Sequence, residues 1–179
     1  MDEPLEPERW PLDRLIDYIL DTHHTYVRSA LSAITRHLAR LREVHGAAHP
    51  ELARIASIFE QVRAELDQHL MKEEQVLFPY VRDLAVHAHE PSGACVSPFG
   101  TVANPIRMME REHEEVTDAL RVIRELTNGY TPPADGDTAY QACLSELAQF
   151  ERDLHRHVHL ENDILFPKAL ELEGRALGA

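Results

Sequence analysis

The sequence has little of what disulfide-bonded, membrane-spanning or nucleic-acid-binding proteins need. Only two of its 179 residues are Cys, seven are Gly, and aromatic residues make up 6%. No apolar run approaches the roughly 18 residues of a transmembrane helix, and the acidic, proline-rich N-terminus lacks a signal-peptide pattern. A net charge of −13 argues against nucleic acid and anionic membrane surfaces as partners. We therefore expect a cytoplasmic protein in which Cys95 and Cys143, which form no spaced framework, are reduced thiols.

Long amphipathic helices are expected to make up most of the chain. Ala, Leu, Glu and Arg are abundant, and apolar residues recur every three or four positions in four stretches separated by Pro and Gly. The expected helices cover residues 12–45, 51–85, 102–128 and 137–173. Gly46 and Gly174 are stop signals, and Pro79 should kink the second helix or end its regular part. Four such helices predict an all-α fold, an antiparallel up-down four-helix bundle.

The chain length predicts a single domain with short extensions at both ends. Residues 1–11 read as a flexible lead, 12–173 as the bundle and 174–179 as a C-terminal tail. Residues 87–100 have no period and many helix breakers, so they are expected to form a long connection. We also expect Trp10 to pack on the bundle.

The pattern H-x-x-x-E-x-x-x-L-F-P occurs twice, at residues 69–79 and 157–167. On a helix, His and Glu four positions apart lie on one face, about 6 Å apart along the axis, and can reach one metal ion. Apolar residues precede both histidines at the same offsets, so each pair continues the core-facing stripe. The pairs His69/Glu73 and His157/Glu161 are therefore predicted to point inward as metal ligands.

These two copies belong to an internal repeat of about 88 residues. On the other two helices, His24 and His113 share apolar neighbours at offsets of −4, +3, +7 and +10. These neighbours are Leu20, Val27, Leu31 and Ile34 for His24, and Met109, Val116, Leu120 and Ile123 for His113. The stripe of the first helix extends back through Ile16 and Leu12. At the same offsets His23 has poorer core neighbours, so His24 is preferred to His23 as the inward residue.

Four inward histidines and two inward glutamates would be costly to bury without partners. Two divalent ions remove that cost, and imidazole with carboxylate suits iron, manganese or zinc. If both glutamates bridge, each metal receives two histidines, two carboxylate oxygens and a bridging oxide or hydroxide. Each six-coordinate iron then keeps one open position. That position predicts binding or redox chemistry of a small ligand such as O₂, NO or peroxide, or release of loosely held iron.

The combined motifs resemble the hemerythrin-like (HHE cation-binding) family, and within it the iron–sulfur cluster repair di-iron proteins. The resembling segments are residues 17–24, 69–79, 108–116 and 157–167. The resemblance implies a hemerythrin-like bundle with a non-haem di-iron centre, a role in repairing iron–sulfur clusters damaged by nitric oxide or oxidants, and iron–sulfur proteins as partners. By position it implies that the ligands are His24, His69, Glu73, His113, His157 and Glu161.

Two features depart from related patterns. Repair proteins commonly carry an additional N-terminal domain with a cysteine pair, whereas only about ten residues precede the first expected helix here. Oxygen-carrying hemerythrins place two histidines four positions apart on the third helix, but Met109 and Thr117 flank His113 at that spacing. Stable oxygen carriage is therefore disfavoured, and the alternative to repair is an O₂- or NO-binding sensor without turnover.

Several other residues are open to two interpretations. Glu65 and Glu112 are candidates for orienting the ligands or lining a polar route to them, or for plain surface ion pairs. A ferritin-like metal-handling site would instead use Asp21 with His24 and Glu110 with His113. His45 is expected at a helix end and the pair His155/His159 on a solvated face. The remaining histidines, expected at the surface, are His37, His49, His87 and His89.

Overall fold

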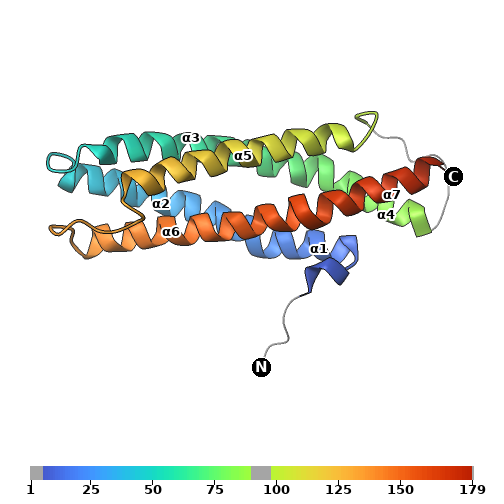
Figure 1. The fold of residues 1–179 in the computed structure, drawn as a ribbon, viewed down its shortest axis with the longest axis horizontal. Helices are drawn as coiled ribbons and strands as arrows, with labels where there is room; N and C mark the ends of the chain where they lie inside the picture. Colours follow the sequence, from blue (N-terminus) through green and yellow to red (C-terminus); the bar gives the residue numbers. More distant parts are fainter. Residues whose placement is uncertain (1–5, 90–97, 179) are drawn as a thin grey trace, which may run out of the picture.

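Four helical rods make up the computed structural model, which describes residues 6–89 and 98–178 (Figure 1). The first rod contains α1 (Leu12–Tyr18), η2 (Ile19–His24) and α2 (Thr25–His45), after a short 3-10 helix η1 (Pro7–Arg9). The second contains α3 (Glu51–Lys72), η3 (Glu73–Leu77) and α4 (Phe78–His89), and the third is α5 (Ala103–Leu126). The fourth contains α6 (Thr138–His159), η4 (Leu160–Leu165) and α7 (Phe166–Gly178). The described residues include no strand, which confirms the all-α prediction.

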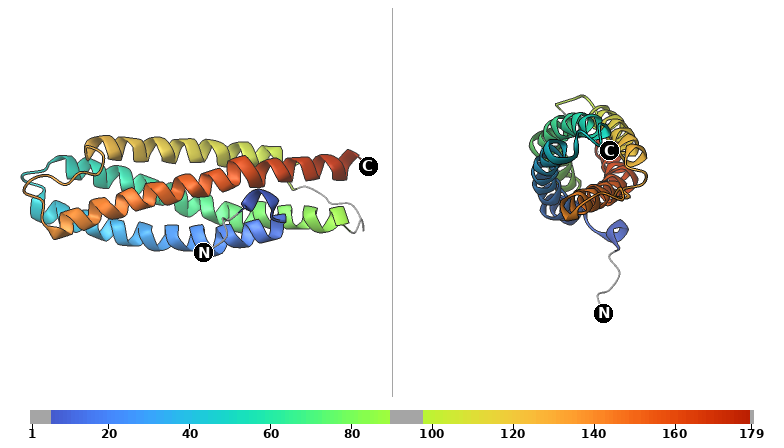
Figure 2. Two further views of the ribbon diagram at one scale, coloured as in Figure 1. Left: turned by 60° about the horizontal axis from the view of Figure 1, so that its bottom comes forward. Right: turned by 90° about the vertical axis from the view of Figure 1, so that its left-hand side faces the viewer.

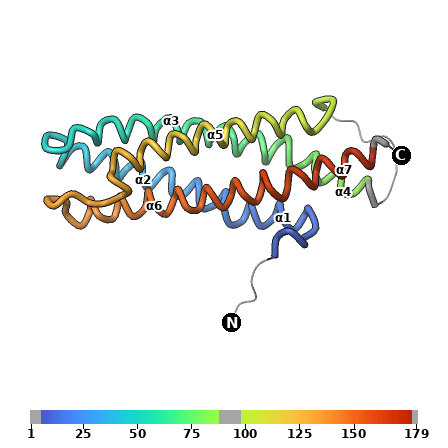
Figure 3. Tube along the Cα trace, in the orientation of Figure 1, coloured from blue at the N-terminus to red at the C-terminus, as the bar shows by residue number. Residues whose placement is uncertain are grey.

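Consecutive rods run in opposite directions and lie side by side around one long axis (Figure 2). Helix α2 packs against α3 and α6, and α5 packs against the same two helices, so the four rods form a closed ring. The helices α4 and α7 pack on each other and extend past the start of α5 (Figure 3). This arrangement is the predicted up-down bundle. Cys95 and most of the connection expected at 87–100 lie outside the described residues.

Three of the rods contain a π-helical turn, which the sequence pattern did not predict. These turns are η2, η3 and η4. A π turn inserts one extra residue, so it rotates the inward face by about 100° relative to a regular α-helix. Leu15 and Ile19 are therefore fully buried, whereas Leu12 and Leu20, which the regular spacing placed inward, are only half-buried.

The expected effect of Pro79 on the second helix and the expected helix end at Gly174 need correction. The regular α-helix of the second rod stops at Lys72, but the rod continues through the π turn and past Pro79. Gly174 does not end the fourth rod, because α7 continues to Gly178 and Gly174 is not among the residues with positive φ. A glycine inside a helix costs only about 1 kcal/mol, so packing overrides it. Residues 174–178 therefore belong to α7 and not to a separate tail.

The residues before the first helix pack on the outside of the bundle as far as they are described. Trp10 meets Tyr18 edge-on at 5.2 Å between ring centroids, and the Arg14 guanidinium lies 4.3 Å from the centre of the Trp10 ring. Lys168 Nζ donates a hydrogen bond to the Trp10 carbonyl at 2.8 Å. The predicted packing of Trp10 is confirmed, and the segment from Pro7 to Trp10 is held against α1 and α7.

Two apolar clusters fill the bundle, with a polar layer between them. One cluster lies between α2, α3, α5 and α6, and it includes Val27, Leu70, Val116 and Leu154 at its inner end. The other holds Ile19, Leu77, Met109 and Leu160 with the rest of α1, α4, α5 and α7. Of the predicted ligands, His24, Glu73, His113 and His157 lie between these residues in sequence on their rods, and His69 and Glu161 are directly adjacent to them; all six are buried. No helix in the described part of the chain has the length and apolar character to cross a membrane.

Glu173 on α7 is hydrogen-bonded to the beginning of α5, and removal of its carboxylate should destabilise the bundle. Its carboxylate accepts hydrogen bonds from the Tyr80 hydroxyl at 2.7 Å, the Thr101 hydroxyl at 2.6 Å and the Val102 amide at 2.9 Å. We expect Glu173→Ala to lower the free energy of unfolding by about 2–4 kcal/mol, because two buried donors and one partly buried donor lose their acceptor. Urea denaturation of the metal-free protein measures the change. Glu171→Ala, which removes only an exposed pair with Arg175, should stay within about 0.5 kcal/mol of the parent, and an equal effect of both substitutions would contradict the assignment.

Candidate metal centre

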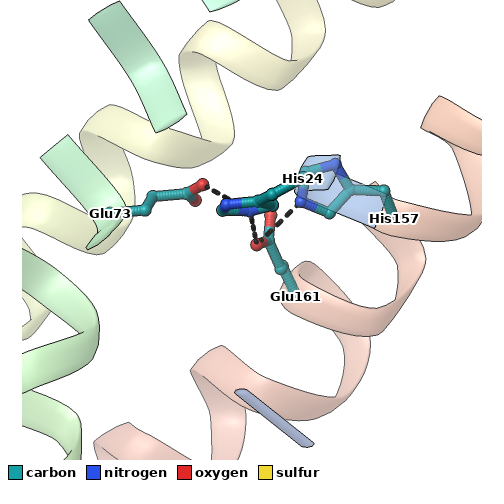
Figure 4. Close-up of side chains that lie close together, drawn as sticks. All are labelled: His24, Glu73, His157 and Glu161. Carbon is teal, nitrogen blue, oxygen red and sulfur yellow. Dashed lines mark hydrogen bonds and ion pairs between the residues drawn. The ribbon is translucent and has the colours of Figure 1, made fainter. Parts of the chain in front are cut away.

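The six predicted ligands meet in two groups at the middle of the bundle. His24, Glu73, His157 and Glu161 form the first, and their ligand atoms all lie within 4.8 Å of one another (Figure 4). The second group is His69, Glu73, His113 and Glu161. Each glutamate therefore belongs to both groups. All six residues are at most 3% exposed.

The first group is built from three of the four rods. His24 Nε2 lies 3.4 Å from Glu73 Oε2 and 3.9 Å from Glu161 Oε1. Figure 4 marks both ion pairs with dashed lines. Glu161 Oε1 also lies 3.0 Å from His157 Nε2, one turn earlier on the same rod. The π turns η2, η3 and η4 carry His24, Glu73 and Glu161, respectively. The wide turns thus coincide with the point where these side chains must reach the bundle axis.

The second group combines the same two glutamates with the other two histidines, His69 and His113. His69 Nε2 lies 3.2 Å from Glu73 Oε1, and His113 Nε2 lies 3.1 Å from Glu161 Oε2. The two Nε2 atoms of His69 and His113 face each other at 2.9 Å. Two ligands that bind one metal at right angles, each at about 2.1 Å, are separated by about 3 Å. The observed separations therefore fit atoms that share an ion.

Unsatisfied polar atoms at the centre supply a test of whether a metal pair fits. Within the described structure, both carboxylate oxygens of Glu73, Oε2 of Glu161 and Nε2 of His24 are buried without a hydrogen-bond partner. Orphaned polar atoms of this kind are rare in folded proteins, and each costs about 1–3 kcal/mol. All four are atoms of the kind that bind a metal cation. The donor set of imidazole and carboxylate therefore fits divalent transition metals.

Without metal, the charges in this layer pair with each other. Burial alone would lower the pKa of His24, but the adjacent carboxylates of Glu161 and Glu73 outweigh burial and raise the pKa to about 10. Burial acts in the same direction on His69, where attraction to Glu73 prevails and raises the pKa to about 9. Burial would raise the pKa of Glu161, yet its three histidine neighbours hold that pKa well below the usual range. The metal-free centre is thus a cluster of imidazolium and carboxylate groups.

Three of the four ligand histidines have an outer nitrogen that is hydrogen-bonded. His24 Nδ1 meets Glu74 at 2.7 Å, His69 Nδ1 meets Glu112 at 2.9 Å, and His113 Nδ1 meets the Asn162 side-chain oxygen at 2.9 Å. Arg28 in turn pairs with Glu74, and Lys72 pairs with Glu112. Such partners fix the ring orientation of a metal-bound histidine and commonly change metal affinity 10- to 100-fold when lost.

Sequence reasoning identified Glu112 but missed Glu74 and Asn162. The signal was present in the repeat, because Glu74 and Asn162 each directly follow the glutamate of an H-x-x-x-E motif. They also serve corresponding histidines, His24 and His113. Glu65 is exposed and makes no hydrogen bond to a ligand within the described residues, which favours the second of its two interpretations, a surface residue.

The structure also places the remaining predicted residues. His23 is buried as fully as His24, because the π turn brings both rings inward, although only His24 belongs to a ligand group. His45 lies at the end of α2, and His155 and His159 are exposed, as predicted. Asp21 is exposed, which removes the ferritin-like arrangement.

Two of the predicted surface histidines are half-buried and paired. His37 meets Glu146 at 2.6 Å, and His49 lies between Glu51 and Asp135. Carboxylates of neighbouring helices and of the loop before α6 hold these rings in place. Cys143 is a buried free thiol, and burial raises its pKa to about 12.

Comparison with known proteins agrees with this geometry. The family described as "Hemerythrin HHE cation binding domain" matches residues 15–169. The chain is 36% identical over 156 residues to a "Probable iron-sulfur cluster repair protein" of Haemophilus influenzae, covering 87% of this chain and 64% of that protein. It is 33% identical over 175 residues to the "Iron-sulfur cluster repair protein YtfE" of Yersinia pseudotuberculosis, covering 96% of this chain and 73% of that protein. The chain thus spans about two thirds to three quarters of these relatives.

Proposed function

The chain belongs to the hemerythrin HHE cation-binding domain family, and from this premise we propose that it holds two iron ions and acts in the repair of iron–sulfur clusters. The observation that carries the proposal is the pair of buried His/Glu groups that share Glu73 and Glu161. Imidazole and carboxylate suit iron, although manganese or zinc also accept these ligands. Carboxylates shared between two positions in a bundle core are the typical support of a dinuclear site.

Each histidine has one role in this proposal. His24 and His157 would hold one ion, His69 and His113 would hold the other, and Glu73 and Glu161 would contribute to both. An iron pair bound there supplies redox chemistry and binding of a small ligand such as O₂, NO or peroxide. Glu74, Glu112 and Asn162 keep three of the rings oriented toward the centre.

Burial of the site limits what can reach it. The six residues are at most 3% exposed, so a client protein or a large organic substrate has no direct access to their ligand atoms. Only small molecules and ions fit that condition. We therefore propose that clients with damaged iron–sulfur clusters receive iron that leaves the bundle, and that nitrosative or oxidative stress is the setting. A cytoplasmic location suits both the reduced Cys143 and such clients.

Recovery of an iron–sulfur enzyme after nitric oxide exposure tests this function. Cells that lack the protein should regain the activity of a [4Fe–4S] dehydratase more slowly than the parent, and the wild-type gene should restore recovery. The Glu73→Ala variant should not restore it. Equal recovery with and without the protein would overturn repair. Equal recovery together with reversible O₂ or NO spectra would support a sensor instead.

A further inference from the structure

The two metal positions have unequal outer support. The internal repeat relates His69 to His157 and relates Glu112, which precedes His113, to His23, which precedes His24. In one half of the bundle Glu112 accepts a hydrogen bond from His69 Nδ1 at 2.9 Å. In the other half a histidine takes the place of this carboxylate. The hydrogen bond between His69 and Glu112 therefore has no carboxylate counterpart at His157.

The structure shows the consequence at His157. Its ring stacks on His23 with 5.7 Å between centroids and 8° between planes. The His157 Nδ1 and the His23 Nε2 are both buried and have no hydrogen-bond partner within the described residues. The other nitrogen of His23, Nδ1, is hydrogen-bonded to Asp153 at 3.1 Å. His157 is 1% exposed, so its ring has almost no contact with bulk solvent.

A histidine that binds metal through Nε2 must carry its proton on Nδ1. For His157 that N–H would be buried without an acceptor, which is unfavourable and leaves the ring less firmly oriented. In the group of His69 and His113, by contrast, both outer nitrogens are hydrogen-bonded. In the group of His24 and His157, only His24 is supported in this way.

We propose that the position formed by His24 and His157 holds its divalent ion more weakly, and is the exchangeable position from which iron is released. The inference rests on the proposed function and makes it more specific, because it names which of the two ions is donated. His23 acts as a positioning residue: by replacing a carboxylate at the repeat-related place, it leaves His157 without outer support. Loss of one such partner corresponds to about a 10- to 100-fold difference in affinity.

Release of iron from the full, iron-loaded chain to a ferrous chelator tests the proposal under anaerobic conditions. The wild-type protein should release its two ions in two phases of equal amplitude, separated by about 10- to 100-fold in rate. Glu112→Gln should speed the slow phase about tenfold and leave the fast phase unchanged. Glu115→Gln, one turn later on α5, removes an exposed pair with Arg111; this variant is the matched control and should change neither phase.

Substitutions at His23 supply the converse experiment. His23→Glu places a carboxylate at the position that Glu112 occupies in the other half, so it should slow the fast phase about tenfold. His23→Phe keeps a stacking ring without an acceptor and should leave the fast phase as it is. Circular dichroism and iron content verify that each variant is folded and loaded. The Glu112→Gln result decides the matter even when a His23 variant does not fold.

The outcomes separate the two proposals. Two ions that leave at one rate, or a Glu112→Gln variant in which the fast phase accelerates, would overturn the inequality of the positions while the di-iron proposal stands. A wild-type protein that cannot be loaded with two irons would overturn the proposed function and the inference with it.

Discussion

Replacing Glu161 with alanine is expected to weaken metal binding at both positions by more than 100-fold. The carboxylate belongs to both ligand groups, and its oxygens lie 3.0 Å from His157 Nε2 and 3.1 Å from His113 Nε2. Losing an outer partner of a ligand already costs about 10- to 100-fold in affinity, and loss of a shared ligand costs more. Iron content after anaerobic loading and desalting, with affinity from chelator competition, measures the effect.

A matched control separates loss of the ligand from loss of the fold. Glu151 is also a buried glutamate of the fourth rod, but its neighbour is Arg124 at 3.6 Å and it lies outside both ligand groups. Glu151→Ala should retain both ions, even though it destabilises the bundle. The ligand assignment fails when Glu161→Ala retains full occupancy, or when both variants lose metal to the same extent.

Metal binding should release about two protons per chain near pH 7.5. The pKa values of His24 and His69 in the metal-free protein are raised to about 10 and about 9, so both rings are protonated at that pH. A metal binds only the neutral imidazole, and the protons must leave. Metal affinity should therefore rise with pH, by about tenfold per pH unit for each released proton. Calorimetry in two buffers of different ionisation enthalpy counts the protons directly.

The same groups predict the opposite pH dependence for the metal-free protein. Because the folded-state pKa of both histidines lies above the unfolded value of 6.5, their contribution to stability is complete below pH 6.5. It is lost as the pH rises through 9 to 10, the two folded-state values. Thermal unfolding of the metal-free protein should thus shift to lower temperature over this range, while His159→Gln, at an exposed position, leaves the shift unchanged. In the calorimetric experiment on metal binding, stoichiometric binding without proton release would contradict the assignment of His24 and His69 as protonated in the metal-free protein.

Much of the fold followed from spacing in the sequence. Local signals determine where α3 and α6 begin, where α2 ends and the order of the four rods. One such signal is Asp137 at the start of α6, whose side chain accepts a hydrogen bond from the Tyr140 amide at 2.8 Å. The inward direction of His69, Glu73, His157 and Glu161 followed because two copies of one motif shared the same apolar frame. The repeat was informative because two copies of the same His/Glu pair at core-facing positions are improbable by chance.

The π turns could not be predicted from regular spacing. A constant period of 3.6 residues assumes that the inward face never shifts, but η2 shifts it between Ile19 and His24. This shift buries His23 together with His24 and moves Leu12 and Leu20 toward the surface. The outer partners Glu74 and Asn162 depend on contacts between rods, which no single helix pattern contains.

Metal analysis of protein purified without added metal, combined with optical and Mössbauer spectra, tests the central claim most directly. The account predicts about two irons per chain, with the absorption of a bridged ferric pair after exposure to air, because Glu73 and Glu161 each serve both ligand groups. A chain that contains zinc or no metal, and that takes up no iron pair on anaerobic reconstitution, would contradict it.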